Sequence, residues 1–331
     1  TADGTVGWGE TYALPGTREV LDLLAHGLIG AETHLAWPRP AGLDEVGASL
    51  AMGAVDIAWH DLVGRVVGVP VHTLLGGATR NRVAAYASGF MYQQDRHPAD
   101  VWPEELEAAL ARGFRAVKVR LGMFPPSMEL PLLEQLVRSA PDEVAVVVDA
   151  WGSYAPAVAL RVGQRLGELG IGWFEEPTNL GYPELAAKLT VPVAGGEMGR
   201  TRQDFARWIS DRTYDVLQPD VAICGGLGAA RFVAELSALH GIRCVPHTWN
   251  GPVMAAASLH LAATLPWSAR VDDGIVMAEG PLLEYDTSDN SLICGLLRSP
   301  LEVRDGYVAV PQGPGLGIDV DEDAVERYRV R

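Results

Sequence analysis

The chain of 331 residues is long for a single hydrophobic core and suits a barrel with a second domain. Its net charge of −16 disfavours nucleic acid and anionic membranes as partners, while a hydrophobic share of 48% supports a large core. Three cysteines without paired spacing are typical of a reducing compartment, and the sequence contains no apolar run of about 18 residues that would span a membrane. We therefore expect a cytoplasmic protein without a nucleic-acid or membrane partner.

Residues 1–82 are predicted to form a mixed α/β capping domain. Val6–Leu14 has the pattern of a strand, and Leu43–Val63 carries apolar residues at helical spacing. The opening TADGTVGWGET lacks the features of a signal peptide and resembles a strand entered midway, so we expect the natural N-terminus to lie outside this sequence. After a turn at Leu74–Arg80, Val83–Ser88 is the first predicted strand of a barrel.

From residue 83 to residue 285, predicted strands and helices alternate, which indicates a parallel sheet. Seven or eight such units imply closure into a barrel. The predicted helices are Pro103–Arg112, Leu130–Ser139, Ala155–Gly167, Pro183–Leu189, Arg202–Ser210, Gly226–His240 and Pro252–Ala263. Trp267–Gly280 is expected to be a long loop before the last strand.

Residues 286–331 do not continue the alternation of strands and helices and are predicted to return to the capping domain. This tail contains Pro300–Val303, Tyr307–Val310, the turn-rich stretch PQGPGLGID and a last short helix at Glu322–Tyr328.

Charged residues end short apolar runs along the barrel at near-regular intervals. Four acids and a histidine follow one another at spacings of 22 to 27 residues: Asp149, Glu175, Glu197, Asp220 and His247. One strand, one helix and two loops occupy roughly this length in a barrel. Because a charge is costly inside a core, we expect these residues to gather on one rim at the barrel mouth.

Three of these acids form a predicted metal site. Asp149, Glu175 and Glu197 on adjacent strand ends would repel one another unless a cation lay between them. Oxygen ligands alone suit a hard divalent ion, and Mg²⁺ by preference. The alternative is a rim of unrelated, solvated acids.

Asp220 and His247 end neighbouring strands and are predicted to meet. A carboxylate behind an imidazole fixes its tautomer and raises its basicity, which produces a general acid or base. The alternative is a structural histidine with a satisfied hydrogen bond.

Lys118 and Arg120 end the run Ala116–Arg120 and point to the same side of their strand. They could neutralise a substrate carboxylate or act on the face of the substrate opposite the histidine. The chain has only two lysines among 26 basic residues, which gives weight to a lysine at a strand end. Two buried structural cations are the alternative interpretation.

Glu284 is predicted to end the last strand and to hydrogen-bond an oxygen that gains charge. Glu279 and Asp286 are competing candidates for this role, as is a merely solvated loop acid. Trp151, Trp249 and Asn250 follow strand ends and are expected to line the pocket, whereas Cys224 is expected to be a packed thiol.

Together these residues resemble the enolase superfamily and, within it, the mandelate racemase-like group. The resemblance covers essentially the whole chain. It rests on an ordered set: the WGET strand, K-x-R at Lys118–Arg120, VVDA with Asp149, WFEEP with Glu175, GGE with Glu197, QPD with Asp220, VPH with His247 and the tail GPGLGIDVDED. Each motif alone is weakly specific, whereas the ordered set with its spacings is highly specific.

The resemblance implies an α/β fold, a modified TIM barrel of the (β/α)7β type. An α+β capping domain built from the N-terminal segment and the C-terminal tail would cover it. The resemblance also implies one Mg²⁺ on Asp149, Glu175 and Glu197, with His247 and Asp220 as the base. Since relatives in this family commonly assemble, a homo-oligomer is expected.

The family's shared first step is removal of the proton α to a carboxylate, which gives an enediolate. The expected partner is therefore a small-molecule carboxylate substrate. Such a proton is a very weak acid, so several groups must stabilise the developing charge, and Lys118 and Glu284 are candidates beside the metal.

Two departures from the family's motifs narrow the expected reaction. Racemases of the group carry K-x-K, with the second lysine as a base, whereas this chain has Arg120, and guanidinium is a poor base. The muconate lactonizing and dipeptide epimerase groups place a lysine after the sixth strand, where this chain reads DVAICGG. A single competent base, His247, suits β-elimination. The resemblance thus points to a lyase, an acid-sugar dehydratase that turns an aldonate or aldarate into a 2-keto-3-deoxy acid.

Two other functions stay open on the sequence. In a racemase or epimerase of a 2-hydroxy carboxylate, Lys118 itself would reach the α-carbon. In a binding protein on the same fold catalysis would have lapsed, although the chain lacks none of the three proposed metal ligands.

Overall fold

The computed structural model describes residues 1–33, 37, 48–180, 182–265 and 280–329. Short parallel strands in these residues pair in the order β8-β1-β2-β3-β4-β5-β6-β7, which confirms the predicted barrel. The strands are β1 (Arg82–Ser88), β2 (Ala116–Arg120), β3 (Ala145–Asp149), β4 (Phe174–Glu175), β5 (Val193–Gly195), β6 (Val216–Leu217), β7 (Arg243–Cys244) and β8 (Leu282–Asp286).

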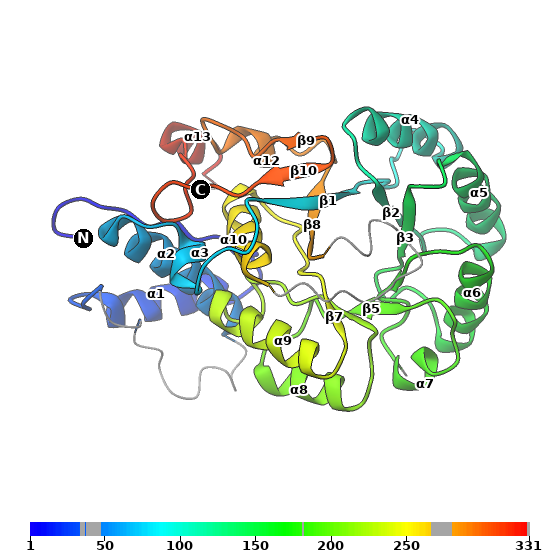
Figure 1. The fold of residues 1–331 in the computed structure, drawn as a ribbon, viewed down its shortest axis with the longest axis horizontal. Helices are drawn as coiled ribbons and strands as arrows, with labels where there is room; N and C mark the ends of the chain where they lie inside the picture. Colours follow the sequence, from blue (N-terminus) through cyan, green and yellow to red (C-terminus); the bar gives the residue numbers. More distant parts are fainter. Residues whose placement is uncertain (34–36, 38–47, 181, 266–279, 330–331) are drawn as a thin grey trace.

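Helices follow the strands and cover the outside of the barrel (Figure 1). They are α4 (Pro98–Ala111), α5 (Pro126–Ser139), α6 (Pro156–Glu168), α7 (Tyr182–Ala186), α8 (Arg202–Ser210), α9 (Leu227–Leu239) and α10 (Pro252–Thr264). The predicted helices are confirmed, with shifted ends. Helix α4 begins five residues earlier than expected because Pro98, rather than Pro103, occupies its first turn, where a missing N–H costs nothing. None of the described helices is long and apolar enough to cross a membrane.

The N-terminal unit lies at one end of the barrel in Figure 1 and contains α1 (Thr17–Leu28), α2 (Ser49–Val67) and α3 (Val71–Leu74). The predicted strand Val6–Leu14 is wrong, since the structure assigns no strand there. This segment packs on α2 instead: a Cβ added at Gly9 would lie 2.0 Å from Ala54 O. The N–H of Trp8 donates to Asp61 on α2 and not to a neighbouring strand.

The C-terminal tail returns to both parts of the chain. Strands β9 (Val303–Arg304) and β10 (Tyr307–Ala309) form a hairpin, and β10 pairs antiparallel with the beginning of β1. Beyond it, Gly315 exchanges backbone hydrogen bonds with Val69 and Val71 beside α3. The short helices α12 (Ser291–Gly295) and α13 (Glu322–Arg327) complete the tail. The predicted loop Trp267–Gly280 lies outside the described residues, apart from Gly280.

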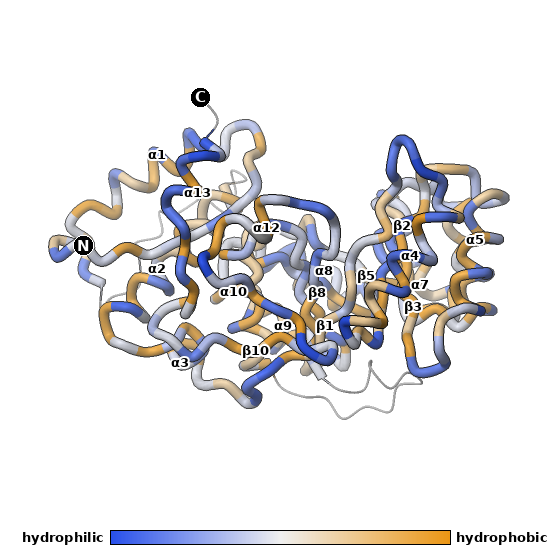
Figure 2. The backbone as a smooth tube through the Cα atoms, turned by 90° about the horizontal axis from the view of Figure 1, so that it is seen from above, coloured by the Kyte–Doolittle hydropathy of each residue, from blue (hydrophilic) through white to orange (hydrophobic). Residues whose placement is uncertain are grey.

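Side chains fill the barrel below its mouth. Tyr86 and Trp173 meet edge to face inside it, with ring centroids 5.5 Å apart, and small residues such as Ala84 and Ala194 occupy the remaining space. Figure 2 shows hydrophobic residues along β2 and β3, whereas the outer helices α4 and α5 alternate in polarity. The lumen is therefore a packed core, and chemistry is confined to the rim.

A buried histidine joins the barrel to the tail. His260 on α10 accepts a hydrogen bond at Nδ1 from the backbone N–H of His72 (3.2 Å), and its Nε2 lies 3.0 Å from Leu316 O. These partners require the neutral imidazole with its proton on Nε2. Burial lowers the pKa of His260 to about 4.

This histidine should make folding depend on pH. The unfolded chain binds a proton at His260 near its ordinary pKa of about 6.5, so the free energy of unfolding should rise between about pH 4 and 6.5. The linked contribution is about 3 kcal/mol at most. Urea titrations across this range should show a flatter pH dependence for His260→Gln than for the wild type. The exposed His26→Gln serves as the control, and an unchanged slope in His260→Gln would contradict the assignment.

Candidate active site

The structure brings all the predicted site residues to one rim. Asp149 and Glu175 end β3 and β4 and are paired across these two strands, while Arg120 on β2 is paired with Asp149. Glu197 follows β5, and Glu284 lies within β8. The parallel register therefore places Asp149 between a neighbour of opposite charge, Arg120, and a neighbour of the same charge, Glu175.

Lys118 is fully buried among carboxylates. Its Nζ lies 2.8 Å from Glu175 Oε1 and 3.5 Å from Asp149 Oδ2, and it forms an ion pair with Glu284. Burial and the neighbouring Arg120 would lower the pKa of Lys118, but the three carboxylates outweigh them and raise it above its usual range. The contacts in this arrangement therefore favour the protonated form of Lys118.

Arg120 is held from several sides. Its guanidinium forms an ion pair with Asp149, and Nη2 donates to Ser88 Oγ at 3.1 Å. The guanidinium carbon lies 4.6 Å from the ring centroid of Trp249 and 5.3 Å from that of Trp151. Of its nitrogens, Nε is buried without a hydrogen-bond partner among the described residues. Arg120 therefore neutralises Asp149 in this arrangement.

His247 and Asp220 form the predicted dyad. The Nδ1 of His247 lies 2.8 Å from Asp220 Oδ2, while Nε2 lies 3.2 Å from Glu197 and 3.9 Å from Glu284. Burial would lower the pKa of His247, but Glu197, Glu284 and Asp220 raise it to about 10. Nδ1 of the imidazole is therefore directed at Asp220, and Nε2 is directed at Glu197 and Glu284.

Tyr12 was not identified from the sequence. Its hydroxyl lies 2.9 Å from Asp220 Oδ2, the oxygen that also contacts His247, and 3.0 Å from Trp249 O. The other oxygen of Asp220 accepts the N–H of Ala222 at 2.7 Å. Tyr12 precedes Asp220 by 208 residues, so no local spacing could have revealed the contact.

Glu284 is the acid of the last strand that joins the site. It accepts hydrogen bonds from Ser88 Oγ (2.7 Å) and from the backbone N–H of Thr248 (2.9 Å). Burial would raise its pKa, but Lys118 leads the cations that hold it below its usual range. Asp286 instead accepts the N–H of Ser288, and the competitor Glu279 lies outside the described residues.

Glu176, next to Glu175, lies just beyond β4 with a backbone φ of 39°. It accepts hydrogen bonds from Tyr182 and from the N–H of Gly196 (2.8 Å). Burial raises its pKa to about 8. Cys224 is buried near Gly226 O, and burial raises the pKa of its thiol, so it is packed as predicted.

The carboxylate oxygens of Asp149, Glu175 and Glu197 are chemically suited to bind a hard divalent ion. Burial, and next to it Glu175, raises the pKa of Asp149 to about 7 despite the cations nearby. Negative charge is in excess, because five carboxylates surround two permanent cations and one imidazole: Asp149, Glu175, Glu197, Asp220 and Glu284. Among the described residues no group of three ligands is already arranged around a metal position. Protein cations bind these carboxylates instead, Arg120 at Asp149 and His247 at Glu197.

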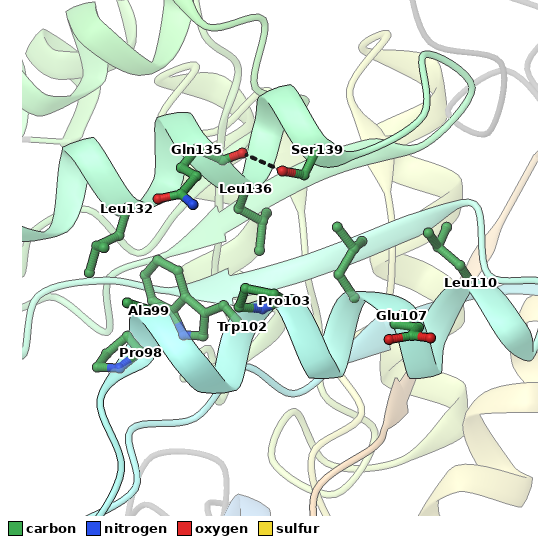
Figure 3. Close-up of a pocket in the computed structure, with 11 residues that line it drawn as sticks. Pro98, Ala99, Trp102, Pro103, Glu107, Leu110, Leu132, Gln135, Leu136 and Ser139 are labelled. Atoms are coloured by element: carbon green, nitrogen blue, oxygen red, sulfur yellow. Dashed lines mark hydrogen bonds between the residues drawn. The ribbon is translucent and has the colours of Figure 1, made fainter.

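A cavity of about 260 Å³ lies elsewhere, between α4 and α5 on the outside of the barrel (Figure 3). Trp102 and Leu136 face each other across it, and Ser139 bonds back to Gln135 along its upper edge. It contains none of the predicted site residues and has mostly apolar walls, so it offers no alternative catalytic centre.

Two known protein families match the chain. Residues 1–76 match the mandelate racemase / muconate lactonizing enzyme N-terminal domain, and residues 102–324 match the enolase C-terminal domain-like family. The chain belongs to the enolase superfamily. The resemblance drawn from the sequence motifs is thereby confirmed.

Individual relatives cover nearly the whole chain. The D-galactarolactone cycloisomerase of Agrobacterium fabrum is 34% identical over 99% of this chain and 89% of its own length. The arabinonate dehydratase of Saccharolobus solfataricus is 28% identical over 100% of this chain and 89% of its own. The crystal structure of the 3,6-anhydro-D-galactonate cycloisomerase from Zobellia galactanivorans superposes with a TM-score of 0.85 at 26% identity, covering 100% and 92% of the two chains.

The contact of Tyr12 with the dyad can be tested. Tyr12→Phe should raise the pKa of His247 further, because Asp220 loses a donor and presents more negative charge to the imidazole. Thr11→Val is a matched control, since it removes the neighbouring hydroxyl bond to Ala222 O (3.1 Å) without touching Asp220. NMR titration of the His247 ring provides the measurement. An equal pKa in all three proteins would show that Tyr12 does not act on the dyad.

Proposed function

We propose that this enzyme, of the hydro-lyase type, removes the α-proton of a sugar acid and expels the oxygen on the β-carbon. The observation that carries the proposal is that one imidazole, His247, and one buried cation, Lys118, both lie beside Glu284, with Nε2 of His247 3.9 Å from its carboxylate. Relatives named as sugar-acid dehydratases support this reaction class. For an aldonate or aldarate, loss of water would give a 2-keto-3-deoxy acid.

The reaction uses His247 twice. This step needs His247 in its neutral form, and a metal ion held by Glu197 would favour that form by offsetting the carboxylate that raises the pKa of His247 most. The neutral imidazole takes the α-proton at Nε2, and the electrons of the broken C–H bond move into the carboxylate as an enediolate. The electrons then return to form the C2–C3 double bond as the C3–O bond breaks. His247 gives its proton to the departing hydroxyl, which leaves as water, and the enol tautomerises to the keto acid. Asp220 holds the ring in place and stabilises the imidazolium.

Lys118 supports the enediolate as a cation and not as a second base. Its ion pair with Glu284, which is not one of the proposed metal ligands, favours the protonated ammonium. A racemase needs a base on each face of the α-carbon, and Arg120, bound to Asp149, cannot supply one. This argument disfavours the racemase or epimerase alternative.

Mg²⁺ is the cofactor we propose. Asp149, Glu175 and Glu197 would hold it, and the ion would supply positive charge to the substrate carboxylate as negative charge develops there. The excess of buried carboxylates supports the assignment. Assembly into a homo-oligomer and a cytoplasmic location stay predictions.

A second candidate function is cycloisomerisation, which the relatives of that name favour. The chemistry differs only in the leaving group. If the β-oxygen belongs to a ring, its expulsion opens the ring and releases no water. Product mass separates the two candidates, because a dehydrated product is lighter by one water and a ring-opened product has the mass of its substrate.

His247→Asn should remove both α-proton exchange and elimination, by about 10²- to 10⁴-fold. Aldonic acids, aldaric acids and their lactones with Mg²⁺ in D₂O form the screen, read by mass spectrometry and NMR. His240→Asn, an exposed histidine at the end of α9, is the matched control. Retention of exchange and elimination in His247→Asn would remove the dyad from the mechanism. Deuterium incorporation with loss of configuration and no keto acid would favour the epimerase.

Mg²⁺ should raise the free energy of unfolding of the wild type, by about 3 kcal/mol at 100 times its dissociation constant. Glu175→Gln should lose this effect because it removes a proposed ligand. Glu176→Gln is the matched control, since the neighbouring carboxyl faces Tyr182 and Gly196 instead. Thermal denaturation and calorimetric titration provide the measurements. No binding to the wild type at millimolar Mg²⁺ would favour a catalytically lapsed binding protein.

A further inference from the structure

Trp151 has an unusual conformation at the rim of the site. Its backbone φ is 54°, in the left-handed region that non-glycine residues rarely occupy, and 53% of its surface is exposed. The two residues before it, Asp149 and Ala150, are buried. A large aromatic side chain left exposed by a strained backbone beside a candidate site is a reason to look for a ligand.

The surroundings hold Trp151 in this position. Its N–H donates to Asp149 Oδ1 at 2.9 Å, and the N–H of the next residue, Gly152, donates to Glu176 O at 2.6 Å. On one side the guanidinium of Arg120 lies 5.3 Å from the indole centroid, and Arg120 is itself fixed by Asp149. The backbone of Trp151 directly, and its indole through Arg120, are therefore linked to the same carboxylate that is proposed to bind the metal.

We propose that Trp151 is a specificity-determining residue, whose exposed indole surface binds the C–H face of the distal carbons of a sugar acid. The inference rests on the proposed function, because it assumes that the carboxylate end of the substrate lies between Lys118 and His247. The carbons beyond C3 of the bound acid then have to extend outward past the rim. Trp151 follows Asp149 on that rim by two residues.

The chemistry of the two partners matches. A sugar chain carries hydroxyl groups on some sides and C–H groups on others, and a flat aromatic surface removes the C–H groups from water without facing the hydroxyls. Because the Asp149 hydrogen bond fixes the backbone of Trp151 and the Arg120 guanidinium lies against its indole, little conformational entropy is lost on binding. This contact grows with chain length and does not involve the reacting atoms.

Chain length therefore provides the test. Kinetics of the wild type, Trp151→Phe and Trp151→Ala are compared on aldonic acids of four and six carbons. Trp151→Ala should raise KM for the six-carbon acid about tenfold or more, and for the four-carbon acid less than about threefold, with kcat little changed. Trp151→Phe should stay close to the wild type because it keeps an aromatic face. Tyr328→Ala, which removes an exposed aromatic residue in the C-terminal tail, is the control.

Calorimetric titration with the same acids keeps this inference separate from the proposed reaction. If the wild type binds the acids but does not eliminate them, the proposed reaction fails, and the dependence of the dissociation constant on chain length still decides the role of Trp151. An equal effect of Trp151→Ala on both acids, a fall in kcat with unchanged KM, or no binding of either acid by the wild type would overturn the inference.

Discussion

Repulsion between buried carboxylates is the constraint around which the mouth of this barrel is organised. Parallel pairing places Asp149 and Glu175 directly beside each other, where burial keeps water from screening their charges. Lys118 reduces this repulsion because its fully buried ammonium lies among three carboxylates, and Arg120 reduces it further through an ion pair with Asp149. Negative charge is still in excess, which favours the binding of a further cation, and Mg²⁺ is the ion that we propose.

The N-terminal unit contributes side chains that contact the candidate active site. Tyr12 contacts Asp220, and Glu10 accepts the backbone N–H groups of Gly251 and Met254 at the start of α10. This segment thereby holds the loops after β6 and β7, which carry the dyad.

The same cations serve binding as well as charge balance. Arg120 contacts Asp149 and also the indoles of Trp151 and Trp249, so one residue joins the charged and the aromatic side chains of the site. A lysine at this position could not stack in the same way, because its ammonium is not planar. Arg120 therefore combines the ion pair with Asp149 and the contacts with both indoles in one side chain.

The sequence alone determined the barrel, the order of its strands and the identity of the polar residues at the mouth, because strand periodicity and strand-end charges are local properties. It did not determine which acid meets which cation, since that depends on register between strands. The Val6–Leu14 prediction failed because the pattern of a strand does not specify a partner, and two glycines let this segment pack on α2 instead. Only the tertiary structure brought Tyr12 to Asp220 and exposed Trp151, because contacts between distant segments arise from packing.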